Sequence, residues 1–268
     1  MPQLKSEGIV LKSVNWKENS RFITFFTEDS GRQSIVDRGG RSLKSKRGRP
    51  LTFSRLDIGY FKSEKTGTGY LSEVEPLESY LFEKDGSLGR LTFASAAVEL
   101  LYDLLPDDEP QRSLYHLTIQ FLRLTDKSPK SSLFPIFLGY FMKFLSQLGY
   151  RPNFAGCVGC GKDVKDFMPE PDNSGPVSNG LAFSPDRGGL VCSACQIPGE
   201  YYIKLHPERL KTAYGLQTAS LLEAAEIRIK YKDSEDILEL LKNFLKYQTD
   251  TRDLKSLEFL GKLKKIKM

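Results

Sequence analysis

The stretch GIVLKSVNWKENSRFITFFTEDSGRQSIVDR, residues 8–38, decides the fold of the first part of this chain. It contains three runs rich in β-branched and aromatic residues, at positions 8–14, 20–27 and 32–38. Asp29, Ser30 and Gly31 provide turn chemistry between the second and third runs. Short runs of this kind, with no helical period between them, predict neighbouring β-strands.

Two further runs follow at residues 53–61 and 69–75. In the first of them Leu56, Ile58 and Tyr60 alternate with polar or small residues, as expected for a strand with one buried face. Five short strands close together in sequence predict a small closed or nearly closed barrel. An OB-type barrel is the commonest such structure, so we expect one over residues 1–80.

The hydrophobic period changes at Ser87, where apolar residues begin to recur at steps of three and four. This period predicts amphipathic helices at residues 88–105, 114–124 and 134–148, and again at 206–214 and 233–248. Pro207 lies near the predicted start of the fourth helix and Gly215 past its end. The fifth has acids in its first turn and Lys246 in its last, which suits the helix dipole.

These patterns predict an α+β multidomain protein, with an N-terminal OB-type β-barrel and an all-helical domain that contains a four-cysteine module. The expected divisions are a barrel at 1–80, a first helical part at 81–153, the cysteine module at 154–200, and a second helical part with a C-terminal tail at 201–268.

The cysteines form two C-x-x-C pairs, Cys157 with Cys160 and Cys192 with Cys195. Two intervening residues let a turn direct both thiolates at one cation, helped by a left-handed backbone at Gly161. Two such pairs close a tetrahedral site, which predicts one structural Zn²⁺ ion that positions the chain and does not react. The alternatives are free thiols or a disulfide. Residues 169–180, between the pairs, are rich in turn formers and predict a loop.

The sequence contains none of the motifs H-E-x-x-H, G-x-x-x-x-G-K-[ST] or G-x-S-x-G. His116 and His206 are expected to be packing or surface residues. The acidic run at residues 107–109 lies between two predicted helices and is interpreted as a solvated turn, not as a metal site. These observations favour a binding protein over an enzyme.

The basic segment, residues 38–55 (RGGRSLKSKRGRPLTFSR), contains seven Arg or Lys residues and no acid. Net charge of the whole chain is only +5, so a polyanion must bind a local patch. Because the segment lies between strands of one predicted barrel, it fits a binding loop better than a linker or a targeting signal. The predicted nucleic-acid contacts are Arg38, Arg41, Lys44, Lys46, Arg47, Arg49 and Arg55. Trp16 is expected to stack on bases, with packing at the barrel edge as the alternative.

The N-terminus MPQLKSEGIVLKSV lacks the apolar core and cleavage site of a secretory signal. The most apolar run, residues 134–150, is interrupted by Lys143 and Gln147 and is too short to span a bilayer. We therefore expect a cytoplasmic protein, in which the part of this run from Phe134 to Phe144 is core.

Several longer motifs occur in a fixed order along the chain. They are EGIVLKSVNWKENSRFITFFTEDSG followed by VDRGGRSLKSKRGRPL, then LGYRPNFAGCVGCG, FSPDRGGLVCSAC and LKSLEFL. Each motif is short, but their order and spacing are specific. Together they resemble the RecO family of bacterial recombination mediators over nearly the whole chain.

The resemblance implies an OB-fold domain, a helical domain and an embedded zinc module. It implies binding to single- and double-stranded DNA, annealing of complementary strands, and cooperation with RecR to load RecA onto DNA coated by the single-stranded DNA-binding protein SSB. The family's basic barrel surface maps onto the seven cations named above, and its metal positions map onto the four cysteines. Many relatives lack these cysteines, so metal is not required for the family's activity. Relatives also bind the C-terminal tail of SSB on the helical domain.

Three features depart from the family pattern, one of which is the long loop between the cysteine pairs. Asp37 places an acid beside Arg38, which is expected to weaken phosphate attraction locally. The lysine-rich end GKLKKIKM is either a second DNA contact or a disordered end.

The resemblance also implies a bacterial protein that associates with the nucleoid during repair. The alternatives are an RNA-binding OB and zinc-ribbon protein of the translation machinery, or a protein scaffold that binds acidic tails.

Overall fold

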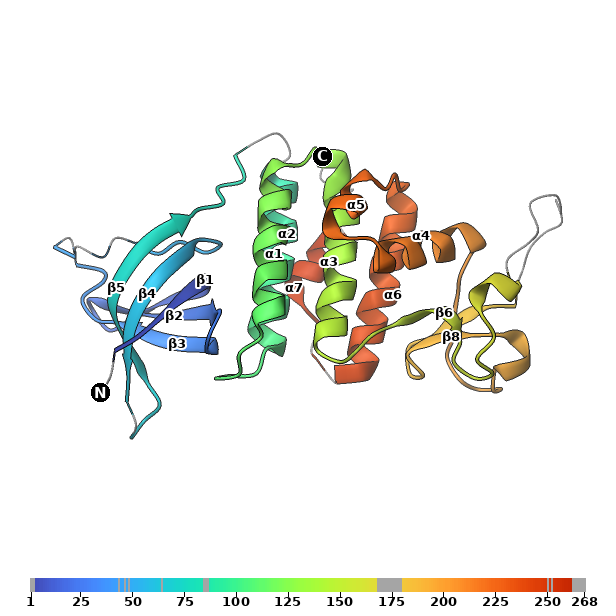
Figure 1. Ribbon diagram of the computed structural model, residues 1–268, viewed down its shortest axis with the longest axis horizontal. Helices are drawn as coiled ribbons and strands as arrows, with labels where there is room; N and C mark the ends of the chain where they lie inside the picture. The colour runs from blue at the N-terminus through green and yellow to red at the C-terminus, as the bar shows by residue number, and fades with distance from the viewer. Residues whose placement is uncertain are drawn as a thin grey trace. The chain divides into compact units, whose positions relative to one another are not determined.

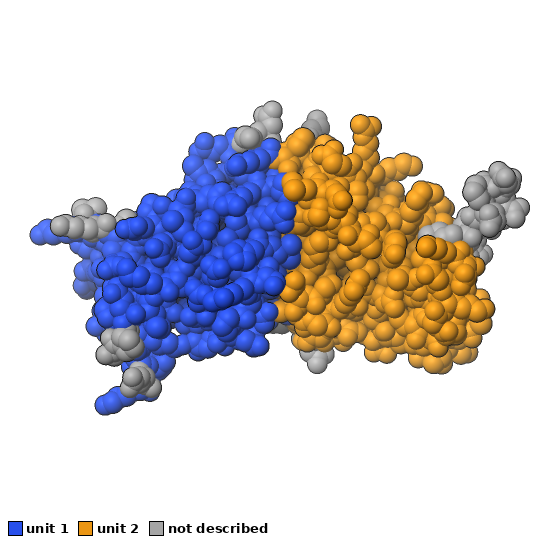
Figure 2. All heavy atoms as spheres, in the orientation of Figure 1, with its two compact units in different colours: residues 1–127 blue, residues 128–268 orange. Residues whose placement is uncertain are grey.

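The structure is a computed structural model that describes residues 3–42, 44–45, 47, 49–63, 65–83, 87–167, 180–249, 251 and 253–261. The chain divides into two compact units, residues 1–127 and 128–268 (Figure 2). The first unit holds a β-barrel and two helices, and the second holds the remaining helices and the four cysteines (Figure 1).

Five strands close into a barrel in the order β1-β2-β3-β5-β4. Their bounds are Gln3–Trp16 (β1), Ser20–Thr27 (β2), Gly31–Asp37 (β3), Arg55–Lys62 (β4) and Gly69–Glu78 (β5). All neighbours are antiparallel except β3 and β5, and β1 closes the barrel by pairing with both β2 and β4. This closed five-stranded barrel confirms the predicted OB-like fold class.

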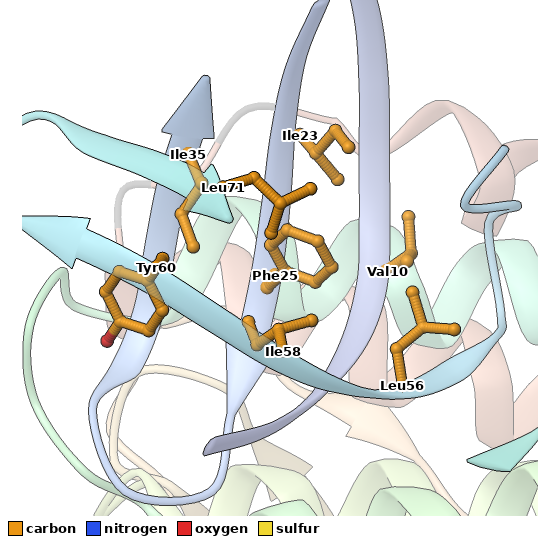
Figure 3. Close-up of a cluster of buried hydrophobic side chains, with 8 residues drawn as sticks. All are labelled: Val10, Ile23, Phe25, Ile35, Leu56, Ile58, Tyr60 and Leu71. Carbon is orange, nitrogen blue, oxygen red and sulfur yellow. The ribbon is translucent and has the colours of Figure 1, made fainter. Parts of the chain in front are cut away.

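Alternate positions of the strands point into the barrel, because successive side chains of a strand face opposite sides. Figure 3 shows the resulting core, which consists of Val10, Ile23, Phe25, Ile35, Leu56, Ile58, Tyr60 and Leu71. The register of β1 shifts between Val10 and Lys12, as in a β-bulge. After the shift Ser13 lies opposite Ile23, so Val14 and Trp16 face outward. The bulge is therefore the reason that Trp16 lies on the outer face of the barrel.

Helices α1 (Ser87–Leu104) and α2 (Arg112–Lys127) pack on the outside of the barrel. The rings of Phe26 on β2 and Tyr115 on α2 meet edge to face with their centroids 5.5 Å apart.

The acidic turn between these helices is also attached to the barrel, which corrects the expectation of a merely solvated turn. Asp107 pairs with Arg32 at 2.7 Å, and Asp108 pairs with Lys62. Both carboxylates stay exposed, yet each one joins the helical connection to a strand.

The second unit is built around α3 (Leu133–Gln147), which follows the short 3-10 helix η1 (Lys130–Ser132). Helices α4 (Pro207–Thr218), α5 (Leu221–Glu226) and α6 (Tyr231–Thr249) contact α3, and α7 (Lys255–Leu260) follows. Nearly all of α3 is buried, which confirms that the apolar run is core. Gly215 lies inside α4, so its predicted place beyond the helix was wrong. Among the described residues no helix is long and apolar enough to cross a membrane.

A small four-stranded sheet carries the cysteines, in the order β6-β8-β7-β9. Its strands are Asn153–Cys157 (β6), Ala182–Ser184 (β7), Gly189–Val191 (β8) and Ile203–Lys204 (β9), with the 3-10 helices η2 (Val164–Phe167) and η3 (Ser193–Cys195) between them. The ring of Phe183 packs edge to face on Phe244 of α6 with centroids 5.9 Å apart. Of the predicted loop at 169–180, all but residue 180 lies outside the described residues.

Candidate nucleic-acid interface and metal site

A groove of about 980 Å³ opens at one end of the barrel. One wall is the end of the β1–β2 hairpin, with Ser13, Val14, Asn15 and Arg21. The other wall is the basic segment, through residues 40–42, Ser45 and 49–52. Of the predicted nucleic-acid contacts, the structure brings Arg41 and Arg49 together at this groove.

Arg41 joins the two walls of the groove. Its Nη1 donates hydrogen bonds to the carbonyl oxygens of Lys17 and Glu18, each at 3.1 Å. Its backbone N–H donates to the carbonyl of Asn19, also at 3.1 Å. Carbonyl partners orient a guanidinium without cancelling its charge, so Arg41 keeps its attraction for phosphate.

Arg49 is exposed at the same groove. Within the part of the chain that the structure describes, neither Arg41 nor Arg49 forms an ion pair with a carboxylate. The groove therefore contains two guanidinium groups whose charge is available to a ligand.

Arg47 and Arg55 are placed differently, because carboxylates hold both. Arg47 donates to Asp37 with 2.9 Å between Nε and Oδ1, and Asp37 is fully buried. Arg55 pairs with Glu7 at 2.5 Å and lies 3.9 Å from Glu78. Burial alone would lower the pKa of Arg55, but the hydrogen bond to Glu7 and its charge raise it above the usual value. Much of the charge on these two side chains is therefore neutralised within the protein.

Of the remaining predicted cations that the structure describes, Arg38 and Lys44 do not line the groove. Arg38 is exposed, and its guanidinium carbon lies 4.1 Å from the centre of the Tyr70 ring. Lys44 is exposed near Ser42. Lys46 lies outside the described residues, as do positions 262–268 of the lysine-rich end.

Trp16 is partly exposed at the end of β1. Its ring packs on Phe22 with centroids 4.8 Å apart, and the Lys17 Nζ lies 4.4 Å from its ring centre. The packing alternative is thus present, yet part of the indole faces solvent.

The strand register places more apolar side chains in one row across the outer face of the barrel. Val14 pairs with Phe22, Phe22 with Val36, and Val36 with Tyr70. We call these four residues with Trp16 the aromatic row. Sequence reasoning missed Phe22, which shares β2 with the inward-facing Phe25, and Tyr70, which precedes the inward-facing Leu71 on β5. Paired residues of adjacent strands lie on the same face of the sheet. Following the face of Trp16 from strand to strand would therefore have identified them.

The four cysteines of the second unit meet at one point. Strands β6 and β8 run parallel, so Cys157 at the end of one lies beside Cys192 just after the other. All four Sγ atoms lie within 4.8 Å of one another, and those of Cys160 and Cys192 are 3.9 Å apart. None of the four forms a disulfide.

A tetrahedral metal with sulfur bonds of about 2.3 Å holds its sulfurs about 3.8 Å apart, so the four cysteines fit one ion. Gly161 has φ +76°, the left-handed conformation expected of it, and its N–H donates to the Cys157 carbonyl at 2.8 Å.

Backbone N–H groups stabilise the thiolate form of Cys157, which is the form that binds a cation. Burial alone would raise the pKa of the Cys157 thiol, but N–H groups of Cys192, Cys160 and Gly159 lower it to about 6. The pKa of Cys195 is raised because its thiol hydrogen-bonds to Cys192 and Cys160. Each thiolate in the cluster makes ionisation of the neighbouring thiols less favourable. One cation bound by all four sulfurs would stabilise all four thiolates.

Arg187 supports the second cysteine pair from outside. Its Nη1 donates to the Cys195 carbonyl at 3.0 Å, and its own N–H donates to Ser184 Oγ at 3.2 Å. The guanidinium thus fixes the turn that carries Cys195 and places a positive charge near a cluster of thiolates.

Comparison with known families agrees with this architecture. Residues 1–80 match the model described as Recombination protein O N terminal, and residues 86–258 match Recombination protein O C terminal. The chain belongs to the RecO family. The DNA repair protein RecO of Symbiobacterium thermophilum is 29% identical, with 96% of each chain covered. The RecO proteins of Pelotomaculum thermopropionicum and Desulfatibacillum aliphaticivorans are 27% and 24% identical, with at least 95% of each chain covered.

The first RecO model covers the whole barrel, including the groove and the aromatic row. The second covers the helices from α1 to α6 and all four cysteines. Both candidate sites therefore lie within the parts of the chain that match RecO.

Proposed function

We propose that the chain is a non-enzymatic DNA-binding mediator of recombinational repair. It binds single- and double-stranded DNA at the groove and anneals complementary strands by neutralising their phosphates. The observation that carries this proposal is the open groove with Arg41 and Arg49 on its wall and no carboxylate paired to either within the described residues. RecO relatives are named as DNA repair proteins, which supports DNA over RNA or an acidic protein as the ligand.

The aromatic row supports a preference for single strands. Unpaired bases expose their faces, and stacking on an aromatic side chain contributes about 1–3 kcal/mol per base. Trp16 is partly exposed and offers such a face, and Arg38, which lies over the ring of Tyr70, can pair with the phosphate that follows a stacked base. In duplex DNA the bases face each other, so the duplex is held by its phosphates alone.

In the second unit we propose that the bound ion is Zn²⁺. Four thiolates in a closed tetrahedron suit Zn²⁺, and no position is left for water or substrate. When bound, the ion would supply structural stability. Cys157, Cys160, Cys192 and Cys195 would hold it.

Family membership supports the wider role. We propose that the chain works with RecR to load RecA onto DNA coated by SSB, that its second unit binds the SSB tail, and that it acts in the bacterial cytoplasm at the nucleoid.

Annealing of complementary oligonucleotides, measured with and without ATP, tests the proposal. Annealing should proceed equally without ATP and should weaken as salt rises, because phosphate contacts release counterions. Annealing that requires ATP, or binding that prefers structured RNA over DNA of the same length, would contradict it.

A further inference from the structure

Asp37 is the last residue of β3 and sits directly before the basic segment. Its side chain is completely buried, and it accepts hydrogen bonds from two guanidinium groups. Arg21 of β2 donates to Oδ2 through Nε, at 2.8 Å, and its Nη2 also lies 2.8 Å from Oδ2. Arg47 donates to Oδ1 through Nε, and its Nη2 also lies 2.9 Å from Oδ1. One carboxylate thus ties strand β2 and residue 47 to the end of β3.

Backbone groups of Asp37, Arg38 and Gly40 take part in contacts around this carboxylate. The N–H of Gly40 donates to the Asp37 carbonyl at 3.4 Å, and Arg47 Nη2 donates to the Arg38 carbonyl. Gly40 is buried so closely that a Cβ added there would overlap the Asp37 carboxylate. Only glycine fits at position 40 while the two arginines keep their hold on Asp37.

Arg38, Arg41 and Lys44 lie in the sequence between Asp37 and Arg47, the residue that the carboxylate binds. Arg21 itself lines the groove. One carboxylate between two guanidiniums leaves these three side chains with a net formal charge of +1. The acid therefore lowers the local charge but fixes where the neighbouring cations stand.

We propose that Asp37 is a positioning residue for DNA binding: its buried carboxylate, between Arg21 and Arg47, fixes the described residues that follow it, so that Arg41 on the groove wall and Arg38 and Lys44 beside the groove are presented to phosphates. The inference rests on the proposed function of the groove. It reverses the expectation from sequence that Asp37 weakens phosphate attraction. Charge alone predicts that Asp37→Asn tightens binding, whereas positioning predicts that it weakens binding.

The test compares Asp37→Asn, Gly40→Ala and the unaltered protein by fluorescence anisotropy of labelled oligo(dT) over a range of salt concentrations. Gly40→Ala disturbs the same contact without changing any charge. Gly215→Ala in α4 is the matched control, because a Cβ there meets nothing within 4 Å. Melting temperature and emission of Trp16, the single tryptophan, are recorded for each protein.

Asp37→Asn and Gly40→Ala should each lose about fivefold in affinity at 0.1 M salt per ordered cation displaced, with a salt slope shallower by about 0.7. Gly215→Ala should bind as the unaltered protein does. A simple steric block at position 40 would reduce affinity without changing the slope, and so would contradict the inference.

Tighter binding by Asp37→Asn, or unchanged binding by Gly40→Ala, would overturn it. If Asp37→Asn does not fold, Gly40→Ala decides alone, with its melting temperature as the check. If the unaltered protein retains no oligo(dT) even at low salt, the proposed function fails and not this inference alone.

Discussion

Arg49 and Arg55 belong to the same basic segment, but their surroundings give them different roles. Arg49 is exposed at the groove, whereas Arg55 lies on β4 with its guanidinium between Glu7 and Glu78. Both are arginines of one basic run, so the sequence does not distinguish them. Only the fold shows that the charge of Arg49 can bind phosphate whereas that of Arg55 is already paired.

Alanine at these two positions should therefore affect different properties. Arg49→Ala should weaken DNA binding about fivefold at 0.1 M salt and make the salt slope shallower by about 0.7, with an unchanged melting temperature. Arg55→Ala should cost about 2 kcal/mol of unfolding free energy, because charged hydrogen bonds are lost, and should leave the slope unchanged. Oligonucleotide titrations and chemical denaturation measure both. Equal changes in slope would show that Arg55 also binds phosphate.

Glu78 on β5 makes the stability of the protein depend on pH. Burial alone would raise the pKa of Glu78, but the hydrogen bonds from Arg123 and the nearby charges of Arg123 and Arg55 lower it below the ordinary value of 4.5. Because the pKa of Glu78 is lower in the folded protein than in the unfolded chain, its carboxylate stabilises the fold at pH values above the unfolded-state pKa. This stabilisation is lost as the pH falls through the folded-state pKa.

Glu78→Gln should therefore cost about 1 kcal/mol at pH 7, and this difference should vanish below the folded-state pKa. Denaturation curves of both proteins between neutral and acid pH measure it. Glu75→Gln, at an exposed position on the same strand, is the matched control. A difference between Glu78→Gln and the unaltered protein that stays constant across this range would contradict the assignment.

At the scale of elements, the barrel strands and the five longer helices could be predicted because their hydrophobic periods extend over many residues. The sheet of the cysteine module could not, since its strands have only two to five residues. Helix α5 carries a capping box between Ser220 and Glu223, a sequence signal that would have revealed it. The cysteine cluster followed from its spacing, whereas the support from Arg187 required coordinates.

The module should be a metal-dependent stabilising element. Chelation, or Cys157→Ser, should lower the melting temperature strongly, because binding of a structural ion contributes directly to folding. DNA affinity measured below the new melting temperature should change little, since the proposed groove lies in the first unit. Loss of DNA binding in a protein that is still folded would disprove a purely structural role.

Arg187→Ala should weaken metal binding about tenfold, as removal of supporting contacts around metal ligands does. Competition with a coloured zinc chelator measures this directly. Arg151→Ala, which removes an exposed arginine just before β6, should have no effect. Equal metal affinity in both variants would show that the contact of Arg187 with Cys195 is incidental.

At the scale of the whole molecule, the barrel, the helical elements and the cysteine cluster agree with a RecO protein. The basic segment could be identified from the sequence. Which of its cations are paired with acids could not, because a run of charges does not show which carboxylates lie against it in the fold. Arg41 and Arg49 meet at the groove, while Arg47 and Arg55 are held by acids from other strands.

We propose above all that exposed cations beside the barrel bind the phosphates of DNA. Retention of a single-stranded oligonucleotide on a filter, measured from low to high salt, tests it most directly. Log affinity should fall linearly with log salt, with a slope of about −0.7 for each phosphate contacted. Absence of retention at low salt, or affinity that does not depend on salt, would contradict the claim.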